Sequence, residues 1–180
     1  RNAEQWHIDS SKIAVMGYSA GGHLAGTVGT LWNSPLVRET LQIPSGEDRP
    51  DGMILGYPVI TSGAYTHEDS IKFLLGEDRY QDEKEREKVS VEKLVNRDTP
   101  KAFLWHTFED DLVPVENTLK MADALRKEGV LFEMHIYPHG PHGLAICDET
   151  TVDVKENLNP YAAYVSSWVE HCIRWIREVL

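Results

Sequence analysis

Hydrophobic residues along this chain gather in four short runs, and the segments between them carry helical or polar patterns. The runs occupy residues 12–17, 52–58, 102–106 and 131–137. The first is continuously apolar from Ile13 to Met16, as expected of a strand that is buried on both faces. The last alternates apolar and polar residues, which is typical of an edge strand. Strands that alternate with helices predict an α/β domain with a parallel sheet.

Three segments show the spacing of apolar residues that is typical of helices. Residues 20–32 are rich in small side chains, and one helical face would carry Ala20, Leu24, Val28 and Leu31. A second helix is predicted from about Val113 and Pro114 to Lys127, with Gly129 as its stop. The third helix, residues 161–180, has an apolar face made of Tyr164, Trp168, Cys172, Trp175 and Val179.

The long connection 61–98 interrupts the alternation of strand and helix. Its part from Glu77 to Lys88 is densely charged, with both signs and little apolar periodicity. This pattern favours a solvated helical face or loop over a binding patch. Because long connections in compact domains tend to be functional, 61–98 is also a candidate lid over a substrate. We therefore predict one catalytic domain, residues 1–180, with 61–98 as a possible lid insertion.

Composition and charge narrow the classes of partner. The chain has 180 residues and a formal net charge of −11, so nucleic acid and anionic membranes are poor partner hypotheses. No apolar run approaches the roughly 20 residues that a membrane-spanning helix needs. The cysteines, Cys147 and Cys172, are far apart and are best interpreted as buried thiols. We expect no cofactor and no metal.

The strongest chemical signal is the sequence Gly17-Tyr18-Ser19-Ala20-Gly21, which lies between the first predicted strand and its helix. In that context Gly-x-Ser-x-Gly is typical of a nucleophile on a sharp, strained turn, and Gly17 and Gly21 would relieve clashes with a Cβ atom. The helix N-terminus would direct free N–H groups at the developing oxyanion, with Ala20 as the first donor. We predict Ser19 as the nucleophile.

A serine nucleophile needs a base, and the base needs an acid that orients it. Asp110 follows the third apolar run and His142 follows the fourth, so all three residues would meet at the carboxyl edge of a parallel sheet. Asp111 is an alternative acid, although the spacing Asp-x-x-Val-Pro favours Asp110. His139 is the alternative base.

Other residues in these segments receive structural interpretations. His139 and His142 flank Gly-Pro without a third metal ligand, so they do not predict a metal site. His23 and His106 are interpreted as packed or hydrogen-bonded histidines. Three aromatic residues could line a pocket but are more typical of the core, namely Tyr57, Tyr65 and Trp105.

With these residues in place, the chain resembles the α/β-hydrolase fold. More narrowly, it is similar to acetyl esterases related to acetylxylan esterases and to hormone-sensitive-lipase-like carboxylesterases. The segments that carry the resemblance are 8–25, 56–60, 99–117 and 137–143. The resemblance implies a parallel sheet with flanking helices and a triad of Ser19, Asp110 and His142. It also implies hydrolysis of small acyl esters, acetyl esters of carbohydrates in particular, through an acyl-enzyme.

Two departures from the family pattern matter. Tyr18 stands where the hormone-sensitive lipase group usually has Asp, and the family's His-Gly-Gly oxyanion segment is absent. The resemblance covers only the C-terminal half of the fold, so we expect roughly three or four further strands before Arg1 and a second oxyanion donor with them. One oxyanion donor is worth about a hundred- to a thousandfold in rate.

Two alternative functions remain open at this point. The same triad would serve an amide hydrolase of the aryl-formamidase or prolyl-peptidase type, because fold does not fix substrate. A truncated, non-catalytic binding module is the other alternative. No targeting segment is recognisable, and a cytoplasmic location is the weakly favoured expectation.

Overall fold

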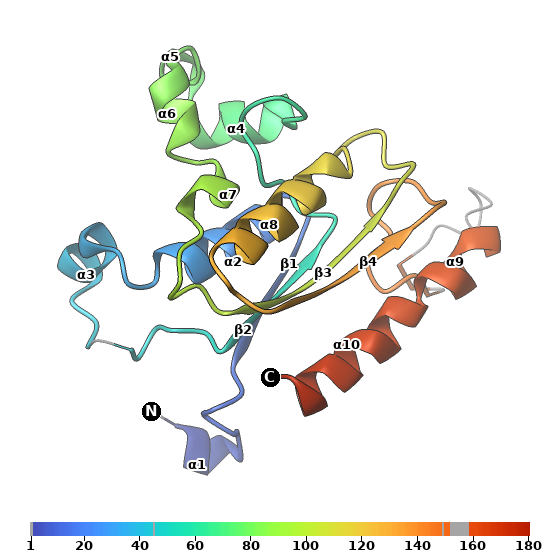
Figure 1. Cartoon of the computed structure of the whole chain (residues 1–180), viewed down its shortest axis with the longest axis horizontal. Helices are drawn as coiled ribbons and strands as arrows, with labels where there is room; N and C mark the ends of the chain where they lie inside the picture. The colour runs from blue at the N-terminus through green and yellow to red at the C-terminus, as the bar shows by residue number, and fades with distance from the viewer. Residues whose placement is uncertain (1, 45, 149, 152–158) are drawn as a thin grey trace.

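The structure, a computed structural model, describes residues 2–44, 46–148, 150–151 and 159–180. Its centre is a parallel sheet with the strand order β1-β2-β3-β4 (Figure 1). The strands are β1 (Ala14–Tyr18), β2 (Gly52–Gly56), β3 (Lys101–Thr107) and β4 (Phe132–Tyr137). Each predicted run is a strand, and the prediction of an α/β fold with a parallel sheet is confirmed.

Helices fill the connections between the strands and close the chain. Those before β2 are α1 (Ala3–Trp6), α2 (Ala20–Leu31) and α3 (Pro35–Leu41). Between β2 and β3 lie α4 (Glu68–Leu75), α5 (Glu77–Tyr80), α6 (Glu83–Glu87) and α7 (Val91–Leu94). The others are α8 (Glu116–Lys127), α9 (Asn159–Val165) and α10 (Ser167–Glu178). The sequence analysis did not predict α3, which Ser34 caps by accepting a hydrogen bond from Val37 N–H.

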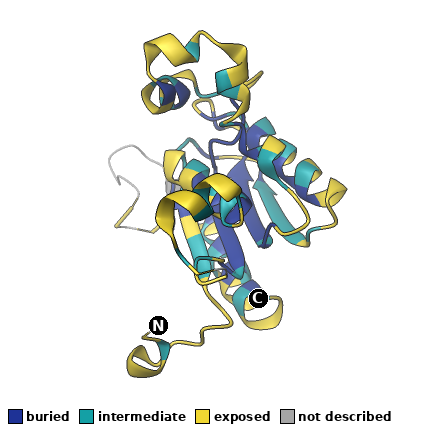
Figure 2. Cartoon of the chain, turned by 90° about the vertical axis from the view of Figure 1, so that its left-hand side faces the viewer, coloured by how far each residue is buried: buried dark blue, intermediate teal, exposed yellow. Residues whose placement is uncertain are grey.

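The two faces of the sheet carry separate cores, because successive side chains of a strand point to opposite sides. On one face, Met53 and Leu55 of β2 pack with α2, α7 and α8. On the other face, Ile54 of β2 packs with Trp168 and Trp175 of α10. β2 and β3 are buried on both faces, and Figure 2 shows this dark centre between more exposed flanks. Burial of this kind is the main stabilising contribution in such a fold.

Helix α2 packs on the sheet through its small residues and not through its predicted apolar face. Gly22, Ala25, Gly26 and Gly29 are buried, whereas Leu24 is 65% exposed and Val28 is 40% exposed. A Cβ atom at Gly29 would lie only 2.1 Å from Met53 Sδ. The helix therefore lies too close to β2 for larger side chains, and this close approach turns Leu24 and Val28 outward.

Strand β1 forms one end of the sheet. Met16 of this strand is 47% exposed and Ile13, just before it, is 42% exposed. The prediction that this run is buried on both faces is wrong for these side chains, since no described strand pairs with the outer side of β1. At the opposite end lies β4, as its alternating pattern predicts.

The C-terminal helical segment is divided into α9 and α10 at Ser166. Trp168, Cys172 and Trp175 are buried as predicted, but Tyr164 is 61% exposed. Tyr164 lies in α9, before the break, and its ring packs edge-on against Tyr137 with the centroids 5.5 Å apart. Cys147 and Cys172 are both buried free thiols, as the sequence predicts. None of the described helices is long and apolar enough to span a membrane.

The connection 61–98 folds as four short helices, α4 to α7, whose surface is largely exposed. This agrees with the predicted solvated helical segment. Ile71 and Leu75 of α4 bury themselves against Val59 and Val113, which follow β2 and β3. The insertion thus rests on the two loops at the carboxyl edge of the sheet. That it acts as a lid stays a prediction.

Candidate active site

Ser19 lies in a strained turn between β1 and α2. Its backbone has φ 54° and ψ −125°, a conformation that a non-glycine residue adopts only when its surroundings enforce it. Ser19 N–H donates to Gly56 O at 3.1 Å, and Ser19 O accepts from Val59 N–H at 3.0 Å. Bonds to β2 and to the loop that follows it therefore hold the turn and present the Ser19 hydroxyl at the edge of the sheet.

Glycine is required at two positions that flank this turn, one at the end of β1 and one at the start of α2. The sequence analysis identified the first of them. A Cβ atom at Gly17 would lie 2.0 Å from Gly21 O, so Gly17 has the predicted role. At Gly21 the same atom would meet nothing within 4 Å, which contradicts the steric role predicted for that glycine. Gly22 is the second glycine that is needed, because its Cβ atom would lie 2.6 Å from Pro58 Cβ. Close approach of α2 to the loop after β2 explains this requirement.

Asp110 lies in a tight turn after β3, with its carboxylate buried. Oδ1 accepts from the backbone N–H groups of Leu112 at 3.1 Å and Val113 at 2.9 Å. Asp111, the alternative acid, is exposed. The structure therefore directs Asp110, and not Asp111, toward the other predicted residues.

His142 joins Asp110 to Ser19. Its Nδ1 lies 2.7 Å from Asp110 Oδ2 and its Nε2 lies 2.8 Å from Ser19 Oγ. The ring packs edge-on against Tyr57, with the centroids 4.9 Å apart. His139, the alternative base, is exposed and instead contacts Glu109 through Nδ1 at 2.9 Å. The structure thus brings together the three residues that the sequence analysis selected.

Hydrogen bonds determine which atoms of Asp110 and His142 carry a proton. Burial disfavours the Asp110 carboxylate, but hydrogen bonds from His106, His142 and Val113 N–H outweigh burial and hold the pKa of Asp110 well below its usual value. An ionised Asp110 only accepts, so His142 carries its proton on Nδ1. The Nε2 atom is then free to accept the Ser19 hydroxyl proton. This is the arrangement that general-base activation of a serine requires.

His106 lies behind Asp110 and is fully buried. Its Nε2 faces two acceptors, Asp110 Oδ2 at 3.2 Å and Val113 O at 2.9 Å, so the proton is on Nε2. Its Nδ1 accordingly accepts from the Thr118 hydroxyl of α8 at 2.7 Å. His106 is a hydrogen-bonded buried histidine, as predicted, but the sequence did not reveal that it contacts the acid.

His23 is held away from this chemistry. Its Nε2 contacts Val89 O at 2.8 Å, and burial lowers the pKa of the imidazole. This side chain ties α2 to the 61–98 segment, so the prediction of a packed histidine is confirmed.

Two further residues lie near the site: Tyr57, which the sequence analysis considered for a pocket but assigned to the core, and Asn117, to which it gave no role. Tyr57 is 5% exposed and supports the His142 ring, while its hydroxyl accepts from Ala145 N–H at 3.0 Å. Asn117 of α8 accepts with Oδ1 from the N–H groups of Ile60 and Thr61, at 2.9 and 3.0 Å. Trp105 belongs to the core, and Tyr65 is 51% exposed. The functions of Tyr57 and Asn117 depend on tertiary contacts, for which the local sequence carries no signal.

A group of potential metal ligands lies elsewhere among the described residues. Three side chains offer ligand atoms within 4.8 Å of one another, namely Glu133, His135 and His171. They lie between β4 and α10, away from Ser19, and the sequence analysis did not identify them.

Comparison with known proteins places this geometry in a family. Residues 1–125 match the BD-FAE family. The chain is 40% identical to endo-1,4-beta-xylanase B of Butyrivibrio fibrisolvens over 149 residues. The matched region covers 83% of this chain and 23% of that relative. It is 34% identical to the acetylxylan esterase of Xylanibacter ruminicola over 145 residues, 79% of the chain and 28% of that esterase.

A solved structure agrees with these relatives. The acetyl ester-xyloside bifunctional hydrolase of Caldicellulosiruptor lactoaceticus superposes with a TM-score of 0.70 at 41% identity, covering 95% of this chain and 60% of that one. The chain thus spans about a quarter of the length of each of the two curated relatives. Together with the parallel sheet and its flanking helices, these matches show that the chain belongs to the BD-FAE family and has the α/β-hydrolase fold.

Proposed function

We propose that this protein hydrolyses small acyl esters, acetyl esters of a carbohydrate in particular, through a covalent acyl-serine intermediate. One observation carries the proposal: Ser19 Oγ, His142 Nε2, His142 Nδ1 and Asp110 Oδ2 form a continuous chain with contacts of 2.8 and 2.7 Å. The esterase names of the relatives, acetylxylan esterase among them, support the class of bond.

In the proposed mechanism, Ser19 Oγ attacks the ester carbonyl carbon while His142 Nε2 takes the hydroxyl proton. The carbonyl oxygen becomes an oxyanion, which accepts a hydrogen bond from Ala20 N–H at the start of α2. Asp110 stabilises the imidazolium through Nδ1–H. His142 then returns the proton to the leaving alcohol oxygen as the carbon–oxygen bond breaks. Water, deprotonated by the same imidazole, releases the acid and restores Ser19.

The choice of carbohydrate acetyl esters rests on the relatives, and a substrate panel tests it. We expect turnover of p-nitrophenyl acetate and of acetylated xylo-oligosaccharides, slower turnover of p-nitrophenyl butyrate, and none of a formanilide or a prolyl peptide. Faster hydrolysis of the amides than of the acetyl esters would overturn the choice of bond, leaving the serine mechanism in place.

The serine mechanism is tested separately, with matched variants. Ser19→Ala and His142→Gln should lose p-nitrophenyl acetate turnover and covalent labelling by a fluorophosphonate probe. His139→Gln is the control, because His139 lies in the same turn as His142 but contacts Glu109 at the surface. We expect His139→Gln to keep most of the activity. Unlabelled wild-type protein would refute an activated serine and favour a binding module.

A further inference from the structure

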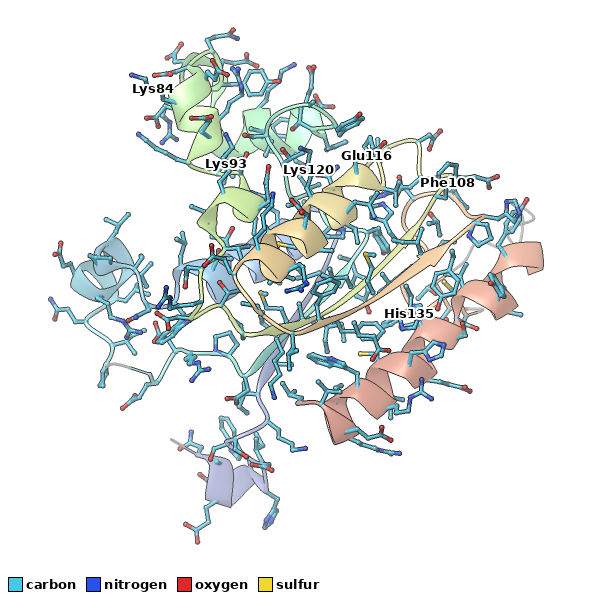
Figure 3. The ribbon with its side chains drawn as sticks, in the orientation of Figure 1. Lys84, Lys93, Phe108, Glu116, Lys120 and His135 are labelled. Carbon is cyan, nitrogen blue, oxygen red and sulfur yellow. The ribbon has the colours of Figure 1, made fainter. Side chains whose placement is uncertain are left out.

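A cluster of side chains that could bind a metal ion lies between α10 and β4, the strand at the end of the sheet opposite to β1. Glu133 and His135 are two residues apart on β4, so both point to the face that α10 covers. His171 of α10 reaches the same place, and its ring stacks on that of His135 with centroids 4.4 Å apart and planes 11° apart. Figure 3 shows His135 between β4 and α10.

We propose that Glu133, His135 and His171 form a binding site for a divalent transition-metal ion of the zinc type. Each side chain offers one ligand atom, and these atoms lie within 4.8 Å of one another. A tetrahedral zinc ion with bonds of about 2.0–2.1 Å needs its ligand atoms roughly 3.4 Å apart. Small rotations of half-buried side chains close that difference, because none of the three is locked in the core.

The ligand set indicates which ions fit. Two imidazole nitrogens and one carboxylate oxygen suit Zn²⁺ and its transition-metal neighbours, whereas Mg²⁺ and Ca²⁺ prefer sites made of oxygen alone. The side chains of His135 and Glu133 are 25% and 33% exposed, which leaves room for water as a fourth ligand. The net charge of −11 adds a general attraction for cations.

Two contacts make the site conditional. His135 Nε2 lies 2.8 Å from Glu133 Oε1, so a metal ion at Nε2 must take the place of the proton between these two atoms. The guanidinium of Arg174, three residues after His171, donates from Nη2 to His171 Nδ1 at 3.0 Å. This bond places the His171 proton on Nε2, so a metal must either displace Arg174 from Nδ1 or shift the proton to bind at Nε2. In both cases Arg174 competes with the metal. Because Arg174 is exposed, it can swing into solvent, and its removal should favour metal binding.

A bound ion would join β4 to the C-terminal helix. Trp168 and Trp175 already bury one face of α10 against the sheet, and His171 lies on the same helix between them. The ion would therefore stabilise a packing that exists without it, and the fold of the ligand variants is expected to survive. Binding of an ion to the native state alone raises the melting temperature through mass action.

Zinc titration by calorimetry tests the proposal. We expect one Zn²⁺ per chain in the micromolar range for the wild type, and affinity weaker by on the order of tenfold or more in His135→Gln, Glu133→Gln and His171→Gln. Arg174→Gln should bind zinc more tightly than the wild type. Circular dichroism checks that each variant folds, and at the same concentration zinc should raise the melting temperature of the wild type more than that of His171→Gln.

Two controls distinguish this site from other histidines. His139→Gln removes a His–Glu pair that lacks a third ligand, and His142→Gln removes the imidazole beside Ser19. Both should bind zinc as the wild type does. Bound Co²⁺ should give the visible absorption of a four-coordinate site, and His171→Gln should lose it. Absence of saturable zinc binding, wild-type affinity in the three ligand variants, or unchanged affinity in Arg174→Gln would overturn the proposal.

Discussion

Replacing Asp110 by asparagine isolates the charge of the proposed acid while keeping its size. The carboxylate has two acceptor oxygens, and its Oδ1 accepts from Leu112 N–H and Val113 N–H. The amide of asparagine has only one acceptor oxygen. An NH₂ group at the Oδ1 position would face both of these donors, so the amide oxygen must stay there. The NH₂ group then points at His142 Nδ1 and His106 Nε2, where Oδ2 accepts in the wild type.

This placement reverses the His142 tautomer. Its Nδ1 must accept from the new NH₂ group, so the ring proton moves to Nε2, which then points at Ser19 as a donor and cannot take a proton. A wrong tautomer of this kind typically lowers kcat by about ten thousandfold, or roughly 5 kcal/mol of transition-state stabilisation. His106 Nε2–H keeps Val113 O as an acceptor at 2.9 Å, so the fold should survive.

The assay is steady-state hydrolysis of p-nitrophenyl acetate, with Asp111→Asn as the matched control. Asp111 carries the neighbouring carboxylate and is exposed. The Asp111→Asn variant should therefore keep nearly all of the activity. We expect the loss in Asp110→Asn to fall on kcat. If Asp110→Asn stayed within tenfold of the wild type while Asp111→Asn lost a thousandfold, the acid would be Asp111 and the tautomer argument would be wrong.

Three further predictions concern the surroundings of the site. His106→Leu removes one hydrogen-bond donor to Asp110, which should raise the pKa of that carboxyl. We expect kcat to fall by about tenfold or more with little change in KM. His106→Gln keeps an N–H donor and should retain more of kcat. Gly22→Ala should destabilise the fold by about 1–3 kcal/mol in urea unfolding, because its Cβ would lie 2.6 Å from Pro58 Cβ. Gly21→Ala, in open space on the same helix, should be neutral or stabilising by up to about 1 kcal/mol, and an equal loss in both variants would contradict the packing argument. Burial raises the pKa of Cys147 to about 12 and that of Cys172 to about 11, so both thiols stay protonated at pH 8 and iodoacetamide should label them only after unfolding.

The parts of the fold that the sequence predicts are those with local causes. A short continuous apolar run between turn residues, such as 52–56, favours a buried strand over a helix because of its length. The order Ser19, Asp110, His142 follows from turns after three strands of one parallel sheet, β1, β3 and β4. The parallel sheet and the segments that carry the site are therefore predictable without coordinates.

What the sequence does not predict depends on close approach between distant segments. Periodicity alone assigns Leu24 and Val28 to the buried face of α2, yet Gly22 and Gly29 pack there because the helix backbone approaches Pro58 and Met53. Nothing local distinguishes His106 from His23, although only His106 contacts Asp110.

The position of Asp110 depends on more than its own turn. Thr118 of α8 holds His106, which in turn donates to the carboxylate and to Val113 O. Asn117, one residue earlier on α8, accepts from Ile60 N–H and donates to Tyr65 O. The first turn of α8 therefore fixes both the acid and the start of the 61–98 segment. A movement of that segment would therefore reach Asp110 through Asn117 and Thr118, which are neighbours on the first turn of α8.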